Sequence, residues 1–246
     1  MEWKTSISHI KDGQEIIRGY NLGDLIANVS FVETIYLILR GKLPNKNEIT
    51  MLNALFTSAI DHGVGVSSAI TARTVISTGN SMHTAIAAGI LAMGKLHGSA
   101  IEGSAKFLQD NINNDDLKTL VVKCKKEHVR IPGYGHKILK DDHRASVVFR
   151  VAKKNNFYKE HCKLAEKIYT ELNKTSSKHL PLNIDGAMGA IISDMGFDWR
   201  MAKGFFIIGR VPGLVAHTYE ELIGSGGLRR LSEDDVEYTG EENKNL

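Results

Sequence analysis

Hydrophobic residues recur at helical spacing along most of the chain, in segments separated by glycine, proline or polar stretches. In the segment 24–40, Leu25, Val29, Val32 and Tyr36 lie three or four positions apart, which predicts one helix with a wide buried side. The same periodicity predicts further helices over residues 48–62, 67–77, 82–96, 116–127, 142–155, 160–175, 183–195 and 200–222.

Alternating patterns typical of strands are scarce. Residues 5–10 and 15–18 predict a short hairpin, because the pair Asp12-Gly13 between them favours a tight turn. The segment 82–96 is almost continuously apolar and rich in alanine and glycine, so we expect a helix that a second helix approaches closely, in the core or at a subunit interface. The predicted fold class is therefore all-α, with at most a small N-terminal β-hairpin.

Length and composition fit one globular catalytic unit over residues 1–246, with 42% hydrophobic and 24% charged residues. We find no repeat and no low-complexity linker, and the acidic tail 233–246 is expected to fray. The net charge is +3, from 31 basic and 28 acidic residues, which does not favour nucleic acid as a partner. It leaves room for a local basic patch suited to a phosphorylated cofactor.

Several classes of protein are disfavoured by missing patterns. No apolar run reaches the roughly 18 residues of a membrane span, and the N-terminus lacks the apolar core of a signal peptide. Cys124 and Cys162 stand far apart, and isolated cysteines suit a reducing compartment, so we expect a cytoplasmic protein with unpaired thiols. Without HExxH, Cys/His clusters, Walker or GxGxxG motifs, we expect no metal site, nucleotide hydrolysis or dinucleotide binding.

Three of the ten histidines lie next to a glycine at the end of a predicted segment. His62 and His97 each precede a glycine, and His136 follows one. A histidine at a helix end can face a cavity while backbone groups orient its ring, which suits chemistry. Each one taken singly fits a capping or packing role as well.

The run 132–136 reads Pro-Gly-Tyr-Gly-His. Two glycines in this run predict exposed backbone N–H groups that a ligand can approach closely. Arg130, Lys137 and Lys140 add positive charge suited to phosphates. The alternative interpretation is a tight turn on a solvated basic face.

Asp185 and Arg210 are charged residues within otherwise apolar segments. Apolar surroundings raise the pKa of a carboxyl group, which lets it act as a general acid or base near neutral pH. Asp185 is equally placed to cap a helix, and the two roles are compatible. A desolvated arginine usually pairs with a carboxylate, and for Arg210 that carboxylate is either internal or part of a ligand.

Seven collinear fragments resemble signatures of the citrate synthase superfamily. They are Thr5-Ser6-Ile7-Ser8, Arg18-Gly19-Tyr20, Asp61-His62, Leu96-His97-Gly98, Pro132-Gly133-Tyr134-Gly135-His136, Asn183-Ile184-Asp185 and Gly209-Arg210. The resemblance covers nearly the whole chain. It implies a shortened citrate-synthase-like helical fold, with a smaller subdomain at roughly residues 100–210 that carries coenzyme A-binding elements. It also implies a coenzyme A thioester as substrate and no permanently bound cofactor.

The resemblance further implies roles for individual residues. His97 resembles the histidine that hydrogen-bonds the thioester oxygen and stabilises the acetyl-CoA enol. Asp185 resembles the carboxylate that moves a proton at the acetyl methyl carbon, and His136 the histidine that exchanges a proton with the oxaloacetate carbonyl or citryl hydroxyl. The dicarboxylate-binding groups correspond to His62, Arg144 and Arg210, with Arg230 for an arginine from a neighbouring subunit. The coenzyme A contacts correspond to Arg130, Pro132, Gly133, Tyr134, Gly135, Lys140 and Lys178.

The spacing of the first fragments separates two activities within the superfamily. Thr5 and Asp61 lie far closer together than in ordinary synthases, which resembles citryl-CoA lyases and the C-terminal lyase module of ATP-citrate lyase. We therefore expect cleavage of citryl-CoA to acetyl-CoA and oxaloacetate. The alternatives are a short citrate or 2-methylcitrate synthase, which His97 favours because it resembles the synthase-type residue, and a non-catalytic coenzyme A-binding subunit. The resemblance also implies a homodimer or higher homo-oligomer and a citrate-activating ligase as partner, without nucleic acid or membrane.

Overall fold

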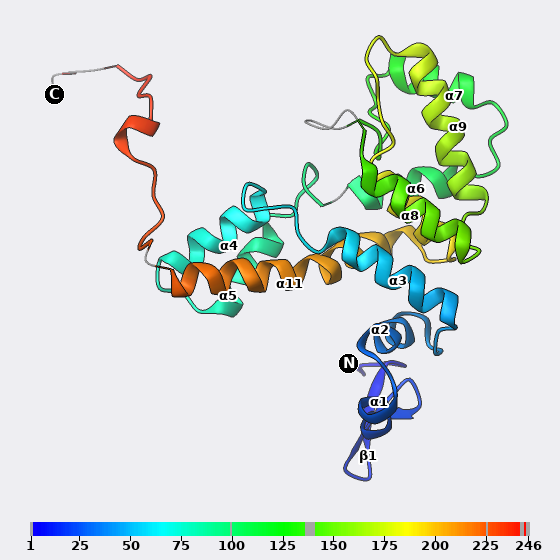
Figure 1. Cartoon of the computed structure of the whole chain (residues 1–246), viewed down its shortest axis with the longest axis vertical. Helices are drawn as coiled ribbons and strands as arrows, with labels where there is room; N and C mark the ends of the chain where they lie inside the picture. The colour runs from blue at the N-terminus through cyan, green and yellow to red at the C-terminus, as the bar shows by residue number, and fades with distance from the viewer. Residues whose placement is uncertain (1, 99, 136–140, 225, 242–243, 245–246) are drawn as a thin grey trace. The chain divides into compact units, whose positions relative to one another are not determined.

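The computed structural model of the chain describes residues 2–98, 100–135, 141–224, 226–241 and 244. Its strands are β1 (Ser8–Lys11), β2 (Gln14–Ile17) and β3 (Tyr20–Asn21). Its helices are α1 (Leu22–Asn28), α2 (Phe31–Arg40), α3 (Lys46–Ala59), α4 (Ser67–Ser77), α5 (Met82–Leu91), α6 (Ala100–Asp110), α7 (Leu117–Lys126), α8 (His143–Lys154), α9 (Glu160–Thr175), α10 (Ile184–Asp194) and α11 (Ala202–Ile223) (Figure 1). The predicted helical fold class with a small N-terminal sheet is confirmed.

The chain divides into two compact units, which we describe separately. Unit 1 comprises residues 1–59 and 98–209, and unit 2 comprises residues 60–97 and 210–246. Helix α11 belongs to unit 1 up to Gly209 and to unit 2 from Arg210 onward. The expected subdomain at roughly residues 100–210 coincides with part of unit 1. That it forms a subdomain of its own stays a prediction.

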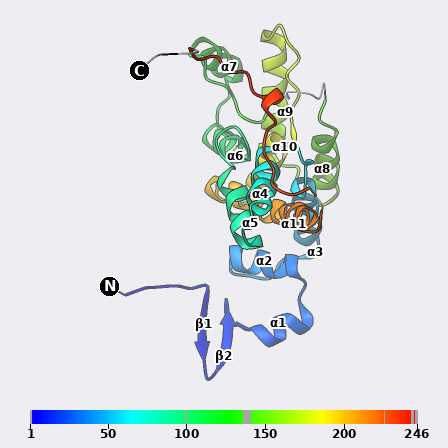
Figure 2. The same cartoon turned by 90° about the vertical axis from the view of Figure 1, so that its left-hand side faces the viewer.

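Helix α10 forms the centre of unit 1, where every one of its residues except Asp185 is buried. It packs against α6, α8 and α9, and Figure 2 shows it between α6 and α8. Small residues make this position accessible. A Cβ atom at Gly189 would lie 2.8 Å from the amide nitrogen of Ala105 in α6, closer than such atoms approach in proteins. The α6–α10 contact is therefore specific for glycine at this point.

The predicted helix over 24–40 is two helices in the structure. Ser30 separates α1 from α2, since its Oγ accepts a hydrogen bond from the Glu33 amide at 3.4 Å while Glu33 Oε2 accepts one from the Ser30 amide at 2.9 Å. This reciprocal pair is a capping box, which starts a new helix within a continuous apolar pattern.

Two further helix predictions need correction. The apolar segment 82–96 is helical only to Leu91, and turns lead from there to His97. Helix α6 was not predicted at all, because two of its four buried positions are the small residues Ser104 and Ala105, which give a weak hydrophobic pattern.

The predicted hairpin is confirmed and is followed by a third short strand. Strands β1 and β2 pair antiparallel with Lys11 opposite Gln14, around Asp12 and Gly13 at φ 51° and 72° (Figure 2). Both residues lie in the left-handed region, as a two-residue hairpin turn requires. Strand β3 then pairs with β2 and leads into α1.

Unit 2 is built from α4, α5 and the later part of α11. The three helices meet at Gly89, where a Cβ atom would lie 2.9 Å from the carbonyl oxygen of Ser68 and 3.2 Å from side-chain carbons of Ala72 and Leu214. Within the part of the chain that the structure describes, no helix combines the length and hydrophobicity that crossing a bilayer requires.

Candidate functional site

The predicted site residues fall into both units. His62, His97 and Arg210 belong to unit 2, whereas Arg144 and Asp185 belong to unit 1. Within each unit, predicted site residues contact further side chains that were not predicted from the sequence.

His97 is half-buried in the turn that precedes α6, and its amide donates to the carbonyl of Gly94 at 3.0 Å. Its Nε2 lies 2.9 Å from Oγ of Ser68, a fully buried residue in the first turn of α4. This hydrogen bond fixes the orientation of the ring and favours one arrangement of its proton. Ser68 was not predicted as a site residue, because a serine near a helix start is ordinary in sequence.

Burial is the largest influence on the His97 ring. It lowers the pKa of His97 below its usual value of 6.5, and electrostatic interactions with Arg210 and His62 lower it further. The ring is therefore neutral at pH 7. A neutral imidazole can donate one hydrogen bond to an oxygen that gains negative charge during a reaction.

Arg210 and His62 come from segments that pack directly against each other. Arg210 is 3% exposed on α11, and His62 is exposed in the loop that follows α3. This loop contacts α11 at Gly213, where a Cβ atom would lie 2.2 Å from the carbonyl oxygen of Ile60. Only glycine at position 213 allows this approach of the His62 loop to the helix that carries Arg210.

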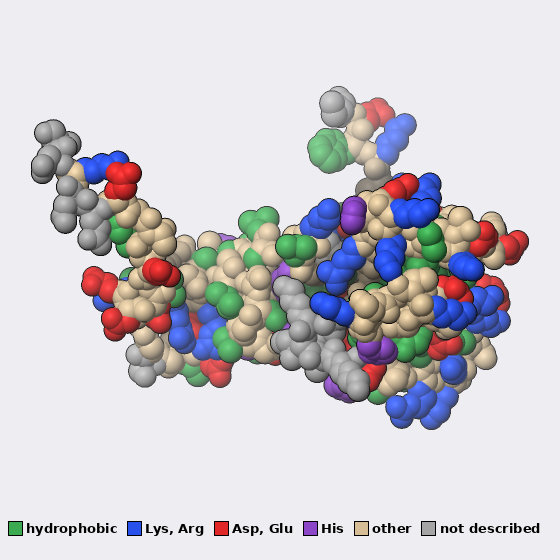
Figure 3. Space-filling model, turned by 90° about the horizontal axis from the view of Figure 1, so that it is seen from above, with side chains coloured by type: hydrophobic (Ala, Val, Ile, Leu, Met, Phe, Trp, Pro, Cys, Tyr) green, Lys and Arg blue, Asp and Glu red, His purple; other side chains and the backbone are tan. Residues whose placement is uncertain are grey.

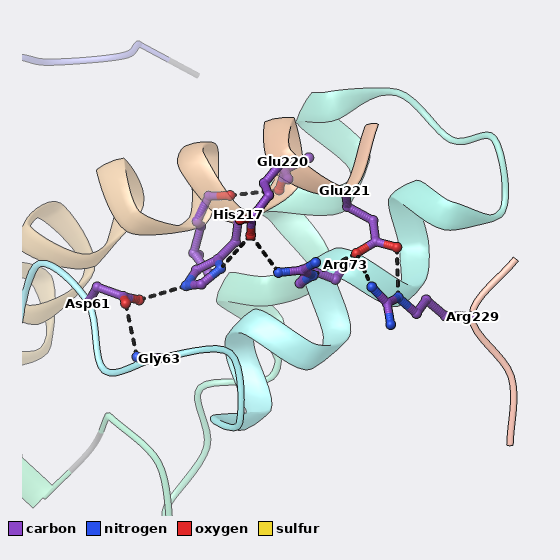
Figure 4. A network of polar contacts seen from close by, with 9 residues as sticks. Asp61, Gly63, Arg73, His217, Glu220, Glu221 and Arg229 are labelled. Atoms are coloured by element: carbon purple, nitrogen blue, oxygen red, sulfur yellow. Dashed lines mark hydrogen bonds and ion pairs between the residues drawn. The ribbon is translucent and has the colours of Figure 1, made fainter. Parts of the chain in front are cut away.

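The two arginines near the C-terminus differ in their contacts. Arg229 donates to Glu221 of α11 through Nε at 2.7 Å and Nη2 at 2.9 Å, and Glu221 also accepts from Arg73 at 2.6 Å (Figure 4). Arg230 is exposed and has no hydrogen bond or ion pair to another residue in the described ranges. Of the two, Arg229 is bound within its own chain, and Arg230 is presented to solvent.

In unit 1, Arg144 is held next to the start of α10. Its Nε and Nη2 donate to the two carboxylate oxygens of Asp142, each at 2.9 Å. The amide of Ile184 donates to Asp142 Oδ2 at 2.8 Å. Burial opposes ionisation of Asp142, but the hydrogen bonds from Arg144 and Ile184 hold the pKa of this carboxyl below its ordinary value. An ionised, buried Asp142 thus connects Arg144 to α10, which carries Asp185 in its first turn.

The turn over residues 132–135 is also joined to the start of α10. The amide of Gly135 donates to the carbonyl of Pro181 at 2.7 Å, and the Asn183 amide donates to the carbonyl of Gly133 at 3.0 Å. Both glycines have φ near +90°. The amide of Gly135 is therefore used within the chain and is not one of the exposed donors expected of this turn.

A cavity of about 340 Å³ lies beside the same turn. Its walls are largely apolar and include Val121, Cys124, Ile131, Tyr134, Leu172 and Leu180. The Tyr134 hydroxyl donates to the carbonyl of Ala165 at 2.9 Å, so this side chain serves as a fixed wall. The size and the largely apolar walls of the cavity suit a small, weakly polar group.

Two of the predicted coenzyme A contacts are exposed cations. They are Arg130, on the wall of the cavity, and Lys178; Figure 3 shows many Lys and Arg side chains, interspersed with Asp and Glu, on the face that it draws. The predicted residues His136 and Lys140 lie outside the described residues. Pro132 lies against α6, where a Cβ atom at Gly103 would meet its ring at 3.0 Å. Among the residues described, no group of three or more His, Cys, Asp or Glu side chains is arranged to hold a metal ion.

Comparisons with known proteins identify the family and the fold of the chain. The family model described as "Citrate synthase, C-terminal domain" matches residues 2–59 and 46–231. The structure of citryl-CoA lyase from Hydrogenobacter thermophilus is similar, with 47% identity, a TM-score of 0.94, and coverage of 99% of this chain and 97% of that chain. ATP citrate lyase from Methanosaeta concilii, solved with (3S)-citryl-CoA, shares the fold with 23% identity and a TM-score of 0.87, over 98% of this chain and 42% of that chain.

Curated relatives give a similar result at lower identity. The probable ATP-citrate synthase of Dictyostelium discoideum is 30% identical over 240 residues, which are 89% of this chain and 36% of the relative. The chain thus spans little more than a third of the length of the first ATP-citrate synthase relatives it matches.

Proposed function

The chain belongs to the citrate synthase family, and from this premise we propose that it is a citryl-CoA lyase, which cleaves citryl-CoA to acetyl-CoA and oxaloacetate. The observation that carries the proposal is the similarity to the Hydrogenobacter thermophilus enzyme over almost the full length of both chains. The environment of His97 supports it, because cleavage next to a thioester needs a neutral donor at the thioester oxygen.

The proposed reaction is a retro-Claisen cleavage in which each proton has a named carrier. His136, assigned through the family resemblance, removes the proton of the citryl hydroxyl. The carbon–carbon bond then breaks, its electron pair passes to the acetyl fragment, and the former hydroxyl becomes the carbonyl of oxaloacetate. His97 donates a hydrogen bond to the oxygen of the resulting enolate, and protonated Asp185 delivers its proton to the methylene carbon, which becomes the methyl group of acetyl-CoA.

The charged side chains have separate proposed tasks. Arg210, His62 and Arg144 bind the carboxylates of the oxaloacetate half, and Arg230 completes this set from a neighbouring subunit. For coenzyme A, we assign the nucleotide end to the 132–135 turn, with the 340 Å³ cavity beside it for the adenine. The exposed cations Arg130 and Lys178, with Lys140 by resemblance, are assigned to the phosphates.

The proposal includes a homodimer at least. In unit 2, Leu91 is 85% exposed and Leu96 is 92% exposed, so large apolar side chains face solvent at the end of α5. A second copy of the chain would cover these side chains, and the family resemblance assigns Arg230 to the site of that neighbour. Citryl-CoA has to be made from citrate before it is cleaved, so we propose a citrate-activating ligase as the preceding enzyme and the cytoplasm as their common location. Sedimentation as a monomer at micromolar concentration would contradict the dimer.

The proposal is tested by incubating the pure protein with citryl-CoA. Oxaloacetate is followed through malate dehydrogenase and NADH consumption, and free coenzyme A through a thiol reagent. Oxaloacetate released without free thiol supports the lyase. Free thiol with citrate and little oxaloacetate would instead indicate the hydrolytic half of a synthase, which condenses acetyl-CoA or propionyl-CoA with oxaloacetate through the same residues. If neither oxaloacetate nor free thiol were formed, the result would indicate a non-catalytic coenzyme A-binding subunit.

A further inference from the structure

One face of α11 carries a row of buried or half-buried residues in unit 2. Arg210, Gly213, His217 and Glu221 follow one another at intervals of three or four positions, and a helix places such residues on one side. Arg210 and Gly213 have been described as a ligand-binding candidate and a point of close contact. The mechanism gives no task to His217 and Glu221.

His217 is bonded to the residue that precedes His62. Its Nε2 lies 3.0 Å from Oδ1 of Asp61, and the other carboxylate oxygen of Asp61 accepts the Gly63 amide at 2.9 Å (Figure 4). Burial raises the pKa of Asp61, but hydrogen bonds from the amides of Gly63 and His62 and from His217 outweigh it and leave the pKa below its ordinary value. Asp61 is therefore a carboxylate that holds both sides of the His62 position and is itself held by His217.

A second carboxylate lies near the other ring nitrogen of His217. Nδ1 of His217 lies 4.0 Å from Oε2 of Glu220, and that oxygen accepts from Arg73 at 2.7 Å. Arg73 also donates to the buried Glu221 at 2.6 Å, as Figure 4 shows. The side chain of His217 is only 15% exposed. The ring is therefore largely enclosed, and its hydrogen bond to Asp61 links its position to that of the loop.

We propose that His217 is a positioning residue, which acts through Asp61 to hold His62 in place for the oxaloacetate half of the substrate. The inference rests on the proposed function in one respect, that His62 is a ligand of the dicarboxylate. It predicts a selective effect, because the Asp61–His217 pair belongs to unit 2 together with the loop of His62, whereas the described residues assigned to coenzyme A belong to unit 1.

Two substitutions separate the donated hydrogen bond from the volume of the ring. His217→Leu introduces an apolar side chain of roughly similar size and removes the ring nitrogen that donates to Asp61. In His217→Gln, the side-chain amide can still donate to Asp61. Tyr219→Leu, on the same helix and 55% exposed, is the matched control. Calorimetry gives the dissociation constants of oxaloacetate and of coenzyme A for each protein, and thermal unfolding checks that each one is folded.

We expect His217→Leu to weaken oxaloacetate binding about 10-fold or more, as the loss of a hydrogen bond to a charged group implies. Coenzyme A binding should change less than about twofold, and His217→Gln and Tyr219→Leu should stay within about threefold of the wild type for both ligands. The inference is overturned if His217→Leu binds oxaloacetate normally, if it weakens both ligands equally, or if His217→Gln is as weak as His217→Leu.

A second measurement tests the role of His217 independently of the proposed substrate. If the wild type does not bind oxaloacetate, the assigned substrate is wrong, yet the position of the His62 ring can still be followed by NMR. Its resonances are assigned by comparison with His62→Gln. We expect them to shift or broaden in His217→Leu and to stay in place in His217→Gln. Unchanged His62 resonances in both variants overturn the inference whatever the substrate.

Discussion

In unit 1, the turn and helix next to Asp185 meet through glycines, with the backbone of residue 133 against the backbone of residue 186. In unit 2, the loop that carries His62 has a glycine contact of its own at Gly213, and a side chain holds it as well, through the bond from His217 to Asp61. Ion pairs of Glu220 and Glu221 with Arg73 lie on the same helix as His217. The glycine contacts are steric, whereas the contacts between charged side chains are electrostatic. They should therefore fail under different conditions.

A steric contact does not depend on pH or salt, but it tolerates no added atom. An electrostatic contact tolerates changes in volume but weakens when a carboxylate is protonated or when salt screens an exposed partner. Substitutions and pH changes can separate the two. The expected effects follow from the largest to the smallest.

The largest effect should come from the chemistry that unit 1 positions. We expect Asp185→Asn to lower the rate of citryl-CoA cleavage by about 10²–10⁴-fold, as the loss of a general acid or base does. Affinity for coenzyme A should stay near that of the wild type, which calorimetry checks. A variant that cleaves citryl-CoA at full rate would show that the packing around residue 185 positions something else.

The next largest effect should come from adding a methyl group at the glycine contact. In Gly186→Ala the new Cβ would lie 2.5 Å from the carbonyl oxygen of Gly133, so we expect a loss of about 1–3 kcal/mol in the free energy of unfolding in urea. Gly204→Ala in α11 is the matched control, because no atom lies within 4 Å of its Cβ position. It should be neutral or stabilising. Equal stability of the two variants would contradict the statement that the contact between residues 133 and 186 is limited by steric fit.

Ser68 offers a smaller test in unit 2. Ser68→Ala removes the hydrogen bond to His97 and should lower kcat for cleavage about 5–10-fold, the ordinary effect of losing one hydrogen bond. Ser67→Ala changes the exposed neighbour in the same helix turn and should leave kcat unchanged. If both variants behaved alike, the Ser68 bond would have no part in orienting His97.

The smallest effect should be a difference that depends on pH. Hydrogen bonds from Arg229 lower the pKa of Glu221 below its ordinary value of 4.5, burial opposes this, and Arg73 lowers it further. A lowered pKa in the folded state means that the stabilisation is complete above pH 4.5 and is lost as the pH falls through the folded-state pKa.

The unfolding temperature of Glu221→Gln should therefore lie below that of the wild type at neutral pH, and the difference should shrink at acidic pH. Glu237→Gln, in the exposed C-terminal segment, should show no difference at any pH. A gap that widens on acidification would contradict the electrostatic interpretation of unit 2.

The hydrophobic pattern predicted most helices because their apolar residues recur at helical spacing or form continuous apolar segments. It missed α6, where Ser104 and Ala105 fill the interface with α10, and it ran through Ser30, whose capping box is a local polar feature. Helix existence depends on spacing, which a sequence displays directly. Helix ends depend on single side chains.

The site divides in the same way. His97, Asp185 and Arg210 could be singled out because their neighbours in sequence are unusual. Ser68, Asp142 and His217 could not, since each acts through a partner far along the chain, 29 residues away for Ser68, 42 for Asp142 and 156 for His217. Nothing in the local pattern of a serine, aspartate or histidine indicates such a partner, so these roles appear only once the chain is folded.

The contact between Gly133 and Gly186 limits how this sequence can drift. Most packing contacts can accept a larger side chain on one side when the other becomes smaller, so that two positions change together over generations. Neither glycine has a side chain that could become smaller. Gly213 faces the carbonyl oxygen of Ile60, and a backbone carbonyl is present whichever amino acid stands at position 60. No second substitution can therefore compensate a change at these positions. They should stay glycine in any descendant that keeps this backbone, while the charged contacts of unit 2 remain open to paired exchange.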